Sequence, residues 1–340
     1  MKNLVWRAFK RLGWALLVVF GVTTLSFFLV HVLPGDPARL LLGPQASAQD
    51  VARAREVYGF NDPVRIRYIR YVRRLVHLGN AMRQDEPRPA EHRSCASFGR
   101  LHVDLGSSFH YRRPIVDLIA AKLPRSIELA LASLAVALAL GMALGVTTAV
   151  RRGGTWDEFG AGVALLGVSA PTFITGLAFQ YVLAHRLGLL PYDGYGKTSA
   201  EHWASICLPA LTLGVHGCAI YARLVRAELG TALEQNYVAA ARAKGASRLR
   251  ATIVHGLRTA LVPVLTLAVL DVGALVGGAV VTEKIFRWPG MGQMAVEAII
   301  NRDGQLVTAT VLVAAVAIVL ATLVVDMCAV FLDPRLARSA

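Results

Sequence analysis

YVAAARAKGASRLRATIVHGLRTALVP, the stretch that occupies residues 237–263, lies between two long apolar runs of the chain. Its basic residues make it too polar to cross a bilayer, whereas its many alanines favour a helix. We expect two helices, at residues 231–244 and 247–258, joined at Gly245, because glycine readily adopts the left-handed conformation that ends a helix. The second helix would carry basic side chains beside apolar ones, which suits docking into a groove on a soluble protein.

Apolar runs dominate the rest of the chain, and 55% of its 340 residues are hydrophobic. Five runs contain no aspartate, glutamate, lysine or arginine, and a sixth contains only Asp271. Each is long enough to cross a hydrocarbon core of about 30 Å as a helix, a conformation that satisfies its own backbone polar groups in lipid. The sequence therefore predicts an all-α membrane protein with six transmembrane helices, at residues 12–33, 129–150, 159–184, 203–222, 259–282 and 306–325.

These runs divide the chain into four parts. We expect an N-terminal tail with the first transmembrane helix at residues 1–33 and a large outer segment at residues 34–122. The transmembrane core would follow at residues 123–333 and a short tail at residues 334–340. The first run is longer than the apolar part of a signal peptide and ends without a small-residue cleavage pattern, so we expect the protein to retain it.

The formal net charge of +14 resembles that of a nucleic-acid-binding protein until the charges are assigned to loops. With the N-terminus inside, the tails and inner loops hold 15 lysines and arginines, and the short outer loops hold five. The other 16 lie in the long segment that ends at Arg125, and loops of that length cross the membrane largely regardless of charge. This bias predicts a multi-pass membrane protein with both termini cytoplasmic and no nucleic-acid partner.

Two short motifs and the cysteines predict no chemistry. GYGKTS, residues 194–199, resembles the end of a phosphate-binding loop, but Pro191 stands where that loop requires its first glycine. HVLPGD, residues 31–36, has a His-x4-Asp spacing, yet its Pro34 and Gly35 are typical of a helix exit. The four cysteines show neither a disulfide framework nor the spacing of metal ligands, so no metal site is predicted.

Two helices are expected in the outer segment. The first begins at Ser47, which Asp50 complements as a capping partner, and the second has Asp62 as its N-cap and Pro63 in its first turn. The second helix is basic and amphipathic, and it suits the membrane surface, a partner subunit or a delivered ligand. Residues 79–102 are polar and aperiodic, which predicts a loop or a disordered insert. The apolar face of the second helix consists of Val64, Tyr68, Ile69, Val72, Leu75 and Val76.

Three polar or helix-breaking residues lie within the apolar runs. Asp271 is almost midway along its run, and a carboxylate at that depth costs about 2.5–3.5 kcal/mol, so it should have a partner and face protein or water. Either a structural hydrogen bond or a place on a solute pathway would meet that requirement. Pro171, with Ser169 close before it, predicts a break in the third run that would serve as a gate or simply as a kink.

Two glycine pairs have the spacing that lets helices approach closely in lipid: Gly141 with Gly145, and Gly273 with Gly277. Static helix packing is the simplest interpretation of each pair. At 100° per residue, Asp271 lies about 200° around its helix from Gly273. The acidic face of this helix and its close-packing face are therefore expected to differ.

With Pro263 following 18 residues after Gly245, the sequence YVAAARAKG resembles the EAA loop of ABC-importer permeases. The resemblance extends over nearly the whole chain, and it is closest to the dipeptide/oligopeptide/nickel group, whose transmembrane domains are of type I. Eight further motifs follow that group's order: VHVLPGDP (30–37), DLGSSF (104–109), LPRSIELAL (123–131), SAPTF (169–173), ARLVRAEL (222–229), VTEKIFRWPGMG (281–292), AIINRD (298–303) and DPRL (333–336).

The resemblance implies a permease subunit of a bacterial cytoplasmic (inner) membrane that is not an enzyme. A second homologous permease would complete the path for a peptide or similar small solute, two ABC ATPase subunits would bind the loop, and an extracytoplasmic solute-binding protein would deliver the solute. ATP and magnesium would be bound by the ATPases, so no cofactor is expected on this chain. Dipeptides, longer peptides, glutathione-like molecules, metal chelates and glycosides all remain open as solutes. The implicated loop residues are Tyr237, Ala240, Ala241, Gly245, Arg248, Arg250, His255 and Pro263.

Three features depart from the group's pattern. Ala239 stands where the EAA consensus has glutamate, and Gln305 stands where a proline is usual. The insert at residues 79–102 is also longer than is usual in the group.

Two other classes of membrane protein are alternatives to the importer permease. A secondary transporter or channel would be expected to show inverted repeats, and no convincing repeat is visible. A membrane-embedded enzyme would need histidines or acids clustered at matching depth. The apolar runs supply only the scattered His31, His216 and Asp271.

Overall fold

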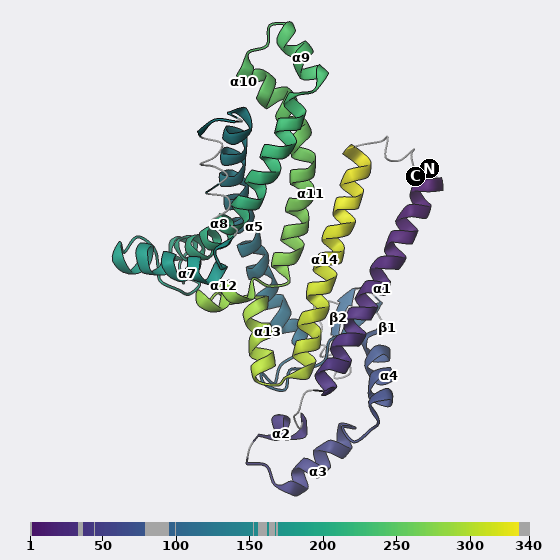
Figure 1. Cartoon of the computed structure of the whole chain (residues 1–340). Coiled ribbons are helices and arrows are strands. Elements are labelled where there is room, and N and C mark those ends of the chain that lie inside the picture. The colour runs from purple at the N-terminus through teal and green to yellow at the C-terminus, as the bar shows by residue number, and fades with distance from the viewer. Residues whose placement is uncertain are drawn as a thin grey trace.

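The structure is a computed structural model that describes residues 2–32, 37–43, 45–78, 95–98, 100–151, 153–155 and 169–332, together with positions 162 and 167. In this part of the chain helices predominate (Figure 1). Five of the described helices are long and apolar enough to cross a membrane, and they overlap five of the six predicted runs, although the run predicted at 259–282 is wrong beyond Val276, where the helix ends. These helices lie at Lys10–Val30, Ile115–Val150, Ser199–Leu233, Arg248–Val276 and Gly304–Met327.

The remaining predicted run, residues 159–184, lies partly outside the described residues. Its described part contains α7 (Thr172–Phe179) and the π-helix η2 (Gln180–Arg186). Pro171 precedes α7 with a φ of −57° and a ψ of 131°, so the backbone is not helical there. The predicted break is therefore present at Pro171, where the residue before a proline is disfavoured in a helix.

A central helix pair organises the bundle. α5 (Ile115–Val150) packs along α8 (Ser199–Leu233), and α11 (Leu257–Val276) contacts both of them. α14 (Gly304–Leu332) lies against α11 on one side and against α1 (Lys2–Val32) on the other (Figure 1). The long helices are therefore arranged side by side, with α1 at one edge.

Apolar side chains of three helices form the core of the bundle. Tyr221 and Val225 of α8 and Val264 of α11 are at most 1% exposed, and they share one cluster with Ala137 of α5. Exposed apolar side chains on the outer faces of the helices are compatible with contact with lipid.

The first turns of α1 and the last turns of α14 lie on the same side of the bundle (Figure 1). Arg11 of α1 forms an ion pair with Asp326 of α14, with a nitrogen–oxygen distance of 2.6 Å. A chain with its ends on one side crosses the bilayer an even number of times. This arrangement agrees with an even number of spans, whereas the described residues contain five.

At the opposite end of the bundle, α12 (Val280–Ile285) and α13 (Met291–Ile300) form a compact turn (Figure 1). The side chain of Glu283 is fully buried in this turn. It accepts hydrogen bonds from Ser126 Oγ and from the backbone nitrogen of Gln293, both at 2.9 Å. Burial raises the pKa of the Glu283 carboxyl group, and these hydrogen bonds offset part of that effect.

Three short helices follow α1: α2 (Pro37–Leu42), α3 (Ala48–Val57) and α4 (Val64–Leu75). The predicted start at Ser47 is confirmed, because Ser47 Oγ accepts a hydrogen bond from the backbone nitrogen of Asp50 at 3.1 Å. Ser47 Oγ also lies 2.6 Å from the Asp50 carboxylate, to which it donates. These bonds satisfy an otherwise unpaired backbone donor at the helix start.

The predicted cap of α4 is wrong by one residue. Pro63 is the N-cap, and Asp62 makes no capping bond because its carboxylate pairs with Arg70 at 2.7 Å. The predicted apolar face of α4 is also largely unburied, with Val64 40% exposed and Ile69 45% exposed.

Aromatic contacts fasten α4 to α1. The Tyr68 hydroxyl lies 2.7 Å from Thr24 Oγ1, within hydrogen-bonding distance. The ring of Tyr71 stacks on Phe27 with 5.2 Å between ring centroids. The outer segment is therefore anchored to the first helix by tyrosines rather than by the whole predicted face.

A small antiparallel sheet corrects the all-α expectation. Its strands are β1 (Val76–Leu78), β2 (Cys95–Phe98) and β3 (Leu101–Asp104), in the order β1-β3-β2. The prediction of a loop across residues 79–102 is wrong where these strands lie, and residues 79–94 fall outside the described part of the chain. In β3, His102 and Asp104 are both buried, which is the two-residue alternation of a strand.

Candidate functional site

The stretch at residues 237–263 forms a loop of short helices between α8 and α11. α9 (Asn236–Ala243) is followed by the single turn α10 (Arg248–Arg250) and by the π-helix η3 (Ala251–Gly256), which leads directly into α11. α9 and α10 project beyond the end of α5 at one end of the bundle (Figure 1). We call the segment from α9 to η3 the projecting loop.

Two boundaries predicted for this loop are wrong. Residues 231–233 complete α8, in which Ala232 is buried, and the chain turns before α9 begins at Asn236. The helix predicted at residues 247–258 does not end there but continues to Val276. The helix continues through Gly256 because the backbone there is helical, at φ −73°. Glycine also fits the helix packing at this position, since a Cβ would lie 2.9 Å from the side chain of Leu229.

Gly245 makes the predicted turn between the two parts of the loop. Its φ is +91°, a left-handed conformation that costs a residue with a Cβ roughly 1–2 kcal/mol. A Cβ built at Gly245 would meet no atom within 4 Å, so the backbone conformation and not space selects glycine. The backbone nitrogen of Ala246 then donates to the carbonyl oxygen of Ala241 at 3.1 Å, closing the turn.

The projecting loop exposes large apolar side chains. Leu249 is 70% exposed, and Ile253 and Val254 are each about half exposed, at 50% and 51%. Val238 of α9 is instead 1% exposed and holds the loop against the bundle. The loop is therefore anchored on one side and offers an apolar surface on the other.

The other predicted loop residues divide between contacts and exposure. Tyr237 Oη lies 3.0 Å from Thr259 Oγ1, and Arg248 Nη2 donates to the carbonyl oxygen of Val150 at 3.3 Å. Ala240 and Arg250 are exposed, whereas His255 and Pro263 are partly buried, Pro263 inside α11.

Asp271 has the partner that its position demands. Tyr221 Oη of α8 donates to Asp271 Oδ2 of α11 at 2.6 Å, and Tyr221 is 1% exposed. The predicted gate residues Ser169 and Pro171 are both exposed and lie at the start of α7. No hydrogen bond among the described residues joins them to Asp271.

The two glycine pairs lie at helix crossings. A Cβ on Gly141 would lie 2.6 Å from the Tyr221 Cβ of α8, and one on Gly145 would lie 2.7 Å from the Ala222 carbonyl oxygen. Gly273 and Gly277 meet α14 instead, with built Cβ distances of 2.5 Å and 3.1 Å to alanine side chains. Asp271 and Gly273 thus contact different helices.

Hydrogen bonds between the segment before α5 and the region of α13 join residues that the sequence motifs did not connect. Asp303 is fully buried and accepts from Ser108 Oγ at 2.5 Å, and Tyr111 Oη donates to Glu297 at 2.5 Å. Burial and then the Glu297 hydrogen bond raise the pKa of Tyr111. Both contacts join residues nearly 200 positions apart, and the signal available was the joint occurrence of DLGSSF and AIINRD.

A second group of side chains ties α5 to α8 near the same end. His202 of α8 pairs with Glu128 of α5, and Arg125 lies over the ring of Tyr195 at 4.6 Å. The buried Trp288 indole donates to the Arg125 carbonyl oxygen at 3.0 Å. These contacts hold α5, the start of α8 and the segment after α12 together.

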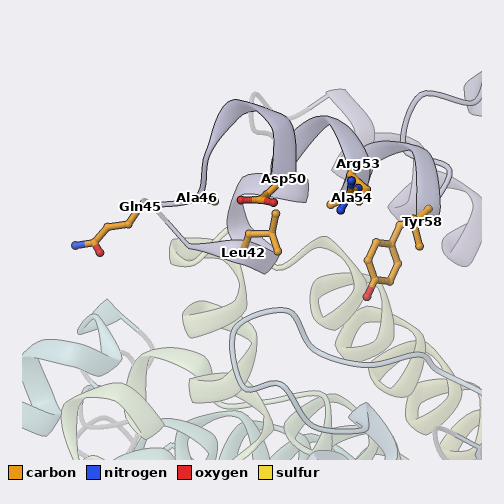
Figure 2. A pocket seen from close by; sticks show the side chains of 8 residues that line it. Leu42, Gln45, Ala46, Asp50, Arg53, Ala54 and Tyr58 are labelled. Atoms are coloured by element: carbon orange, nitrogen blue, oxygen red, sulfur yellow. The ribbon is translucent and has the colours of Figure 1, made fainter.

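A cavity of about 500 Å³, which the sequence did not predict, lies between α2 and α3. Leu42, Asp50 and Tyr58 border it (Figure 2), together with Arg53. The 75% exposed side chain of Val57 also lies at its edge. The cavity therefore combines charged and apolar groups.

Long apolar helices and a projecting loop that exposes apolar side chains define a multi-pass helical membrane protein. Residues 141–338 match the family described as "Binding-protein-dependent transport system inner membrane component". Residues 4–130 match the corresponding N-terminal family of membrane components. The chain belongs to this family of permeases, and it is a permease component of an ABC importer in the inner membrane.

Individual relatives share most of their length with this chain. The "Glutathione transport system permease protein GsiC" of Salmonella paratyphi A (strain ATCC 9150 / SARB42) is 34% identical over 327 residues, which cover 96% of this chain and 97% of the relative. The protein of the same name from Escherichia coli (strain K12) is 35% identical over the same coverage.

A solved structure shows the same fold. It is an inward-facing conformation of the MetNI methionine ABC transporter, in its CY5 native crystal form, with a TM-score of 0.53 and 18% identity. The similarity covers 63% of this chain and 96% of that chain. The helix bundle of this protein therefore has the fold of an ABC importer permease.

Proposed function

We propose that the chain pairs with a second homologous permease, and that the two enclose the path of a peptide or similar small solute. The single observation that supports coupling of this chain to ATPase subunits is the projecting loop, with its left-handed Gly245 and its exposed Leu249. Two ABC ATPase subunits, which bind ATP and magnesium, would each grip one such loop. ATP-driven closure of the ATPases would then move α8 and α11, the helices that carry the loop.

Three finer features complete this proposal. The run at residues 159–184 supplies a sixth span, and the ion pair between Arg11 and Asp326 supports an even number of crossings. The charge bias supports placing both termini and the projecting loop in the cytoplasm. The division of the chain at residues 33, 122 and 333 follows from the same topology.

The solute is proposed to be a small peptide of the size of glutathione. Support comes from the glutathione permeases, which align with 96% of this chain. An extracytoplasmic solute-binding protein would deliver it to the outer segment. The cavity between α2 and α3 provides charged and apolar groups for that contact.

Leu249→Glu combined with Ile253→Glu tests the loop's role. The two charges would be buried unpaired in an apolar docking groove, so we expect recovery of the ATPases with the affinity-purified chain to fall at least about tenfold. Both side chains are exposed, so the variant should fold as wild type does. Val57→Glu, at an exposed site on the outer segment, is the matched control. Wild-type recovery of the ATPases by the double variant would refute the assignment.

Cysteine labelling tests the topology. In a background without Cys207, which is exposed, Val57→Cys is expected to react with a membrane-impermeant thiol reagent in intact spheroplasts. Leu249→Cys should react only after the membrane is permeabilised, because it lies on the projecting loop. Labelling of the two positions in the reverse order would overturn the proposed orientation.

A further inference from the structure

A cavity of about 250 Å³ lies at the base of the projecting loop. Its walls come from the end of α5, the end of α8, α9 and the start of the helix that continues into α11. Arg242 of α9 and Arg248 of α10 both line it, and Glu234 is the one acidic residue among its described lining residues. Two guanidinium groups from opposite sides of Gly245 therefore border one small space.

The two arginines differ in how many of their guanidinium N–H groups are already hydrogen-bonded. Arg248 Nη2 donates to the Val150 carbonyl oxygen at 3.3 Å, which leaves most of its five N–H groups available. The Arg242 guanidinium forms no ion pair within the part of the chain that the structure describes. The planar fork of a guanidinium matches the oxygens of a phosphate group, so the pair is suited to a phosphate ligand.

The cavity lies at the depth of lipid headgroups. Gly145 packs against Ala222, where the apolar run of α8 ends, and the apolar run of α5 ends at Val150, beside the cavity. The five residues from Gly145 to Val150 span about 7.5 Å along a helix. Headgroups add about 5–8 Å to each side of the hydrocarbon core, so the cavity falls within their layer.

We propose that this cavity binds the phosphate group of an anionic phospholipid between Arg242 and Arg248. Basic pockets between transmembrane helices on the cytoplasmic side are suited to such headgroups. The bound phosphate bridges α9 to α10 across the Gly245 turn and so holds the projecting loop in one conformation. Leu249 and Ile253 are exposed and do not line the cavity, so lipid binding leaves the apolar docking surface free.

Thermal unfolding of the full chain purified in detergent tests the proposal. The probes are dihexanoyl-phosphatidylglycerol, dihexanoyl-phosphatidylcholine and inorganic phosphate, each titrated at constant ionic strength. A ligand that binds the folded state raises the Tm with its concentration, and the dependence gives an apparent Kd. The variant is Arg242→Gln, and Arg250→Gln is the control because it removes the same charge from an exposed position outside the cavity.

We expect phosphatidylglycerol to raise the Tm of the wild type and of Arg250→Gln more than phosphatidylcholine does. In Arg242→Gln the apparent Kd should rise at least about tenfold, as the loss of a charged hydrogen bond predicts. An equal, Arg242-dependent shift with inorganic phosphate would support the phosphate site and identify free phosphate as its source. Equal shifts with the two lipids, or equal Kd values in the two variants, would overturn the proposal. If Arg242→Gln does not fold, the comparison of the two lipids on the wild type still decides.

Discussion

Gly145→Leu is expected to prevent α5 from packing on α8 and to remove most of the folded chain from the membrane. A Cβ at this position would lie 2.7 Å from the Ala222 carbonyl oxygen and 2.7 Å from the Val225 Cβ, closer than real contacts allow. Overpacking costs about 1–3 kcal/mol even where side chains can shift. Here the obstacle includes backbone of the central helix pair, so the expected loss is at the upper end of that range or above it.

The measurement is the amount of chain in the membrane fraction together with its Tm after purification. Gly13→Leu is the control, because a Cβ at Gly13 of α1 would meet no atom within 4 Å. It introduces the same side chain into an apolar helix without a steric obstacle. If Gly145→Leu matched this control in yield and Tm, the close contact between α5 and α8 would be refuted.

Hydropathy predicted most of the fold because lipid imposes a simple rule on long helices. A backbone without water must satisfy its own hydrogen bonds, so a run of about 20 apolar residues has few alternatives to a helix. Five described spans follow the predicted runs on this basis. The positions of their ends were harder to predict, since α8 and α11 extend past their apolar runs to carry the projecting loop.

The small sheet was missed because its strands are short and β1 lies far from the other two in the sequence. β1 pairs with β3 across residues 79–100, and three- or four-residue strands have too little periodicity to be recognised singly. A local signal was present in Gly99-Arg100, which separates β2 from β3. A two-residue connection that begins with glycine favours a type II′ hairpin turn.

Individual site residues were predictable where one residue decides the conformation. Gly245 is an example, because glycine adopts a positive φ without the steric cost that a Cβ imposes. The need of Asp271 for a partner was predictable from its depth, but the identity of Tyr221 depends on how α8 packs against α11. The cavity beside Arg242 was not predictable, since it forms only when α9 folds back over the ends of α5 and α8.

Asp271→Asn is expected to slow the uptake of cationic peptides about tenfold and to leave that of neutral peptides, glutathione-sized or smaller, near the wild-type rate. We propose that the carboxylate attracts a solute ammonium group during passage. Asp271 is only partly buried, whereas its partner Tyr221 is 1% exposed, so the acid is the more accessible of the two. In a medium of low dielectric constant such an attraction exceeds the 1.4 kcal/mol that corresponds to a tenfold effect.

The asparagine separates charge from structure. Its amide oxygen can still accept the 2.6 Å hydrogen bond from Tyr221 Oη, so the contact between α8 and α11 persists while the charge is lost. Tyr221→Phe does the reverse, because it keeps the charge and removes the hydrogen bond. An unpaired buried polar group costs about 1–3 kcal/mol, so this variant should have a lower Tm and transport all solutes more slowly to the same degree.

The decisive measurement is uptake into vesicles that contain the reconstituted importer, with a cationic and a neutral peptide assayed in parallel. Assembly with the partner subunits is measured on the same samples, since a loss of assembly would slow both solutes alike. A tenfold change in the ratio of cationic to neutral uptake in Asp271→Asn, with no such change in Tyr221→Phe, places Asp271 on the pathway. Equal slowing of both peptides in both variants would instead show that Asp271 serves only to join α11 to α8.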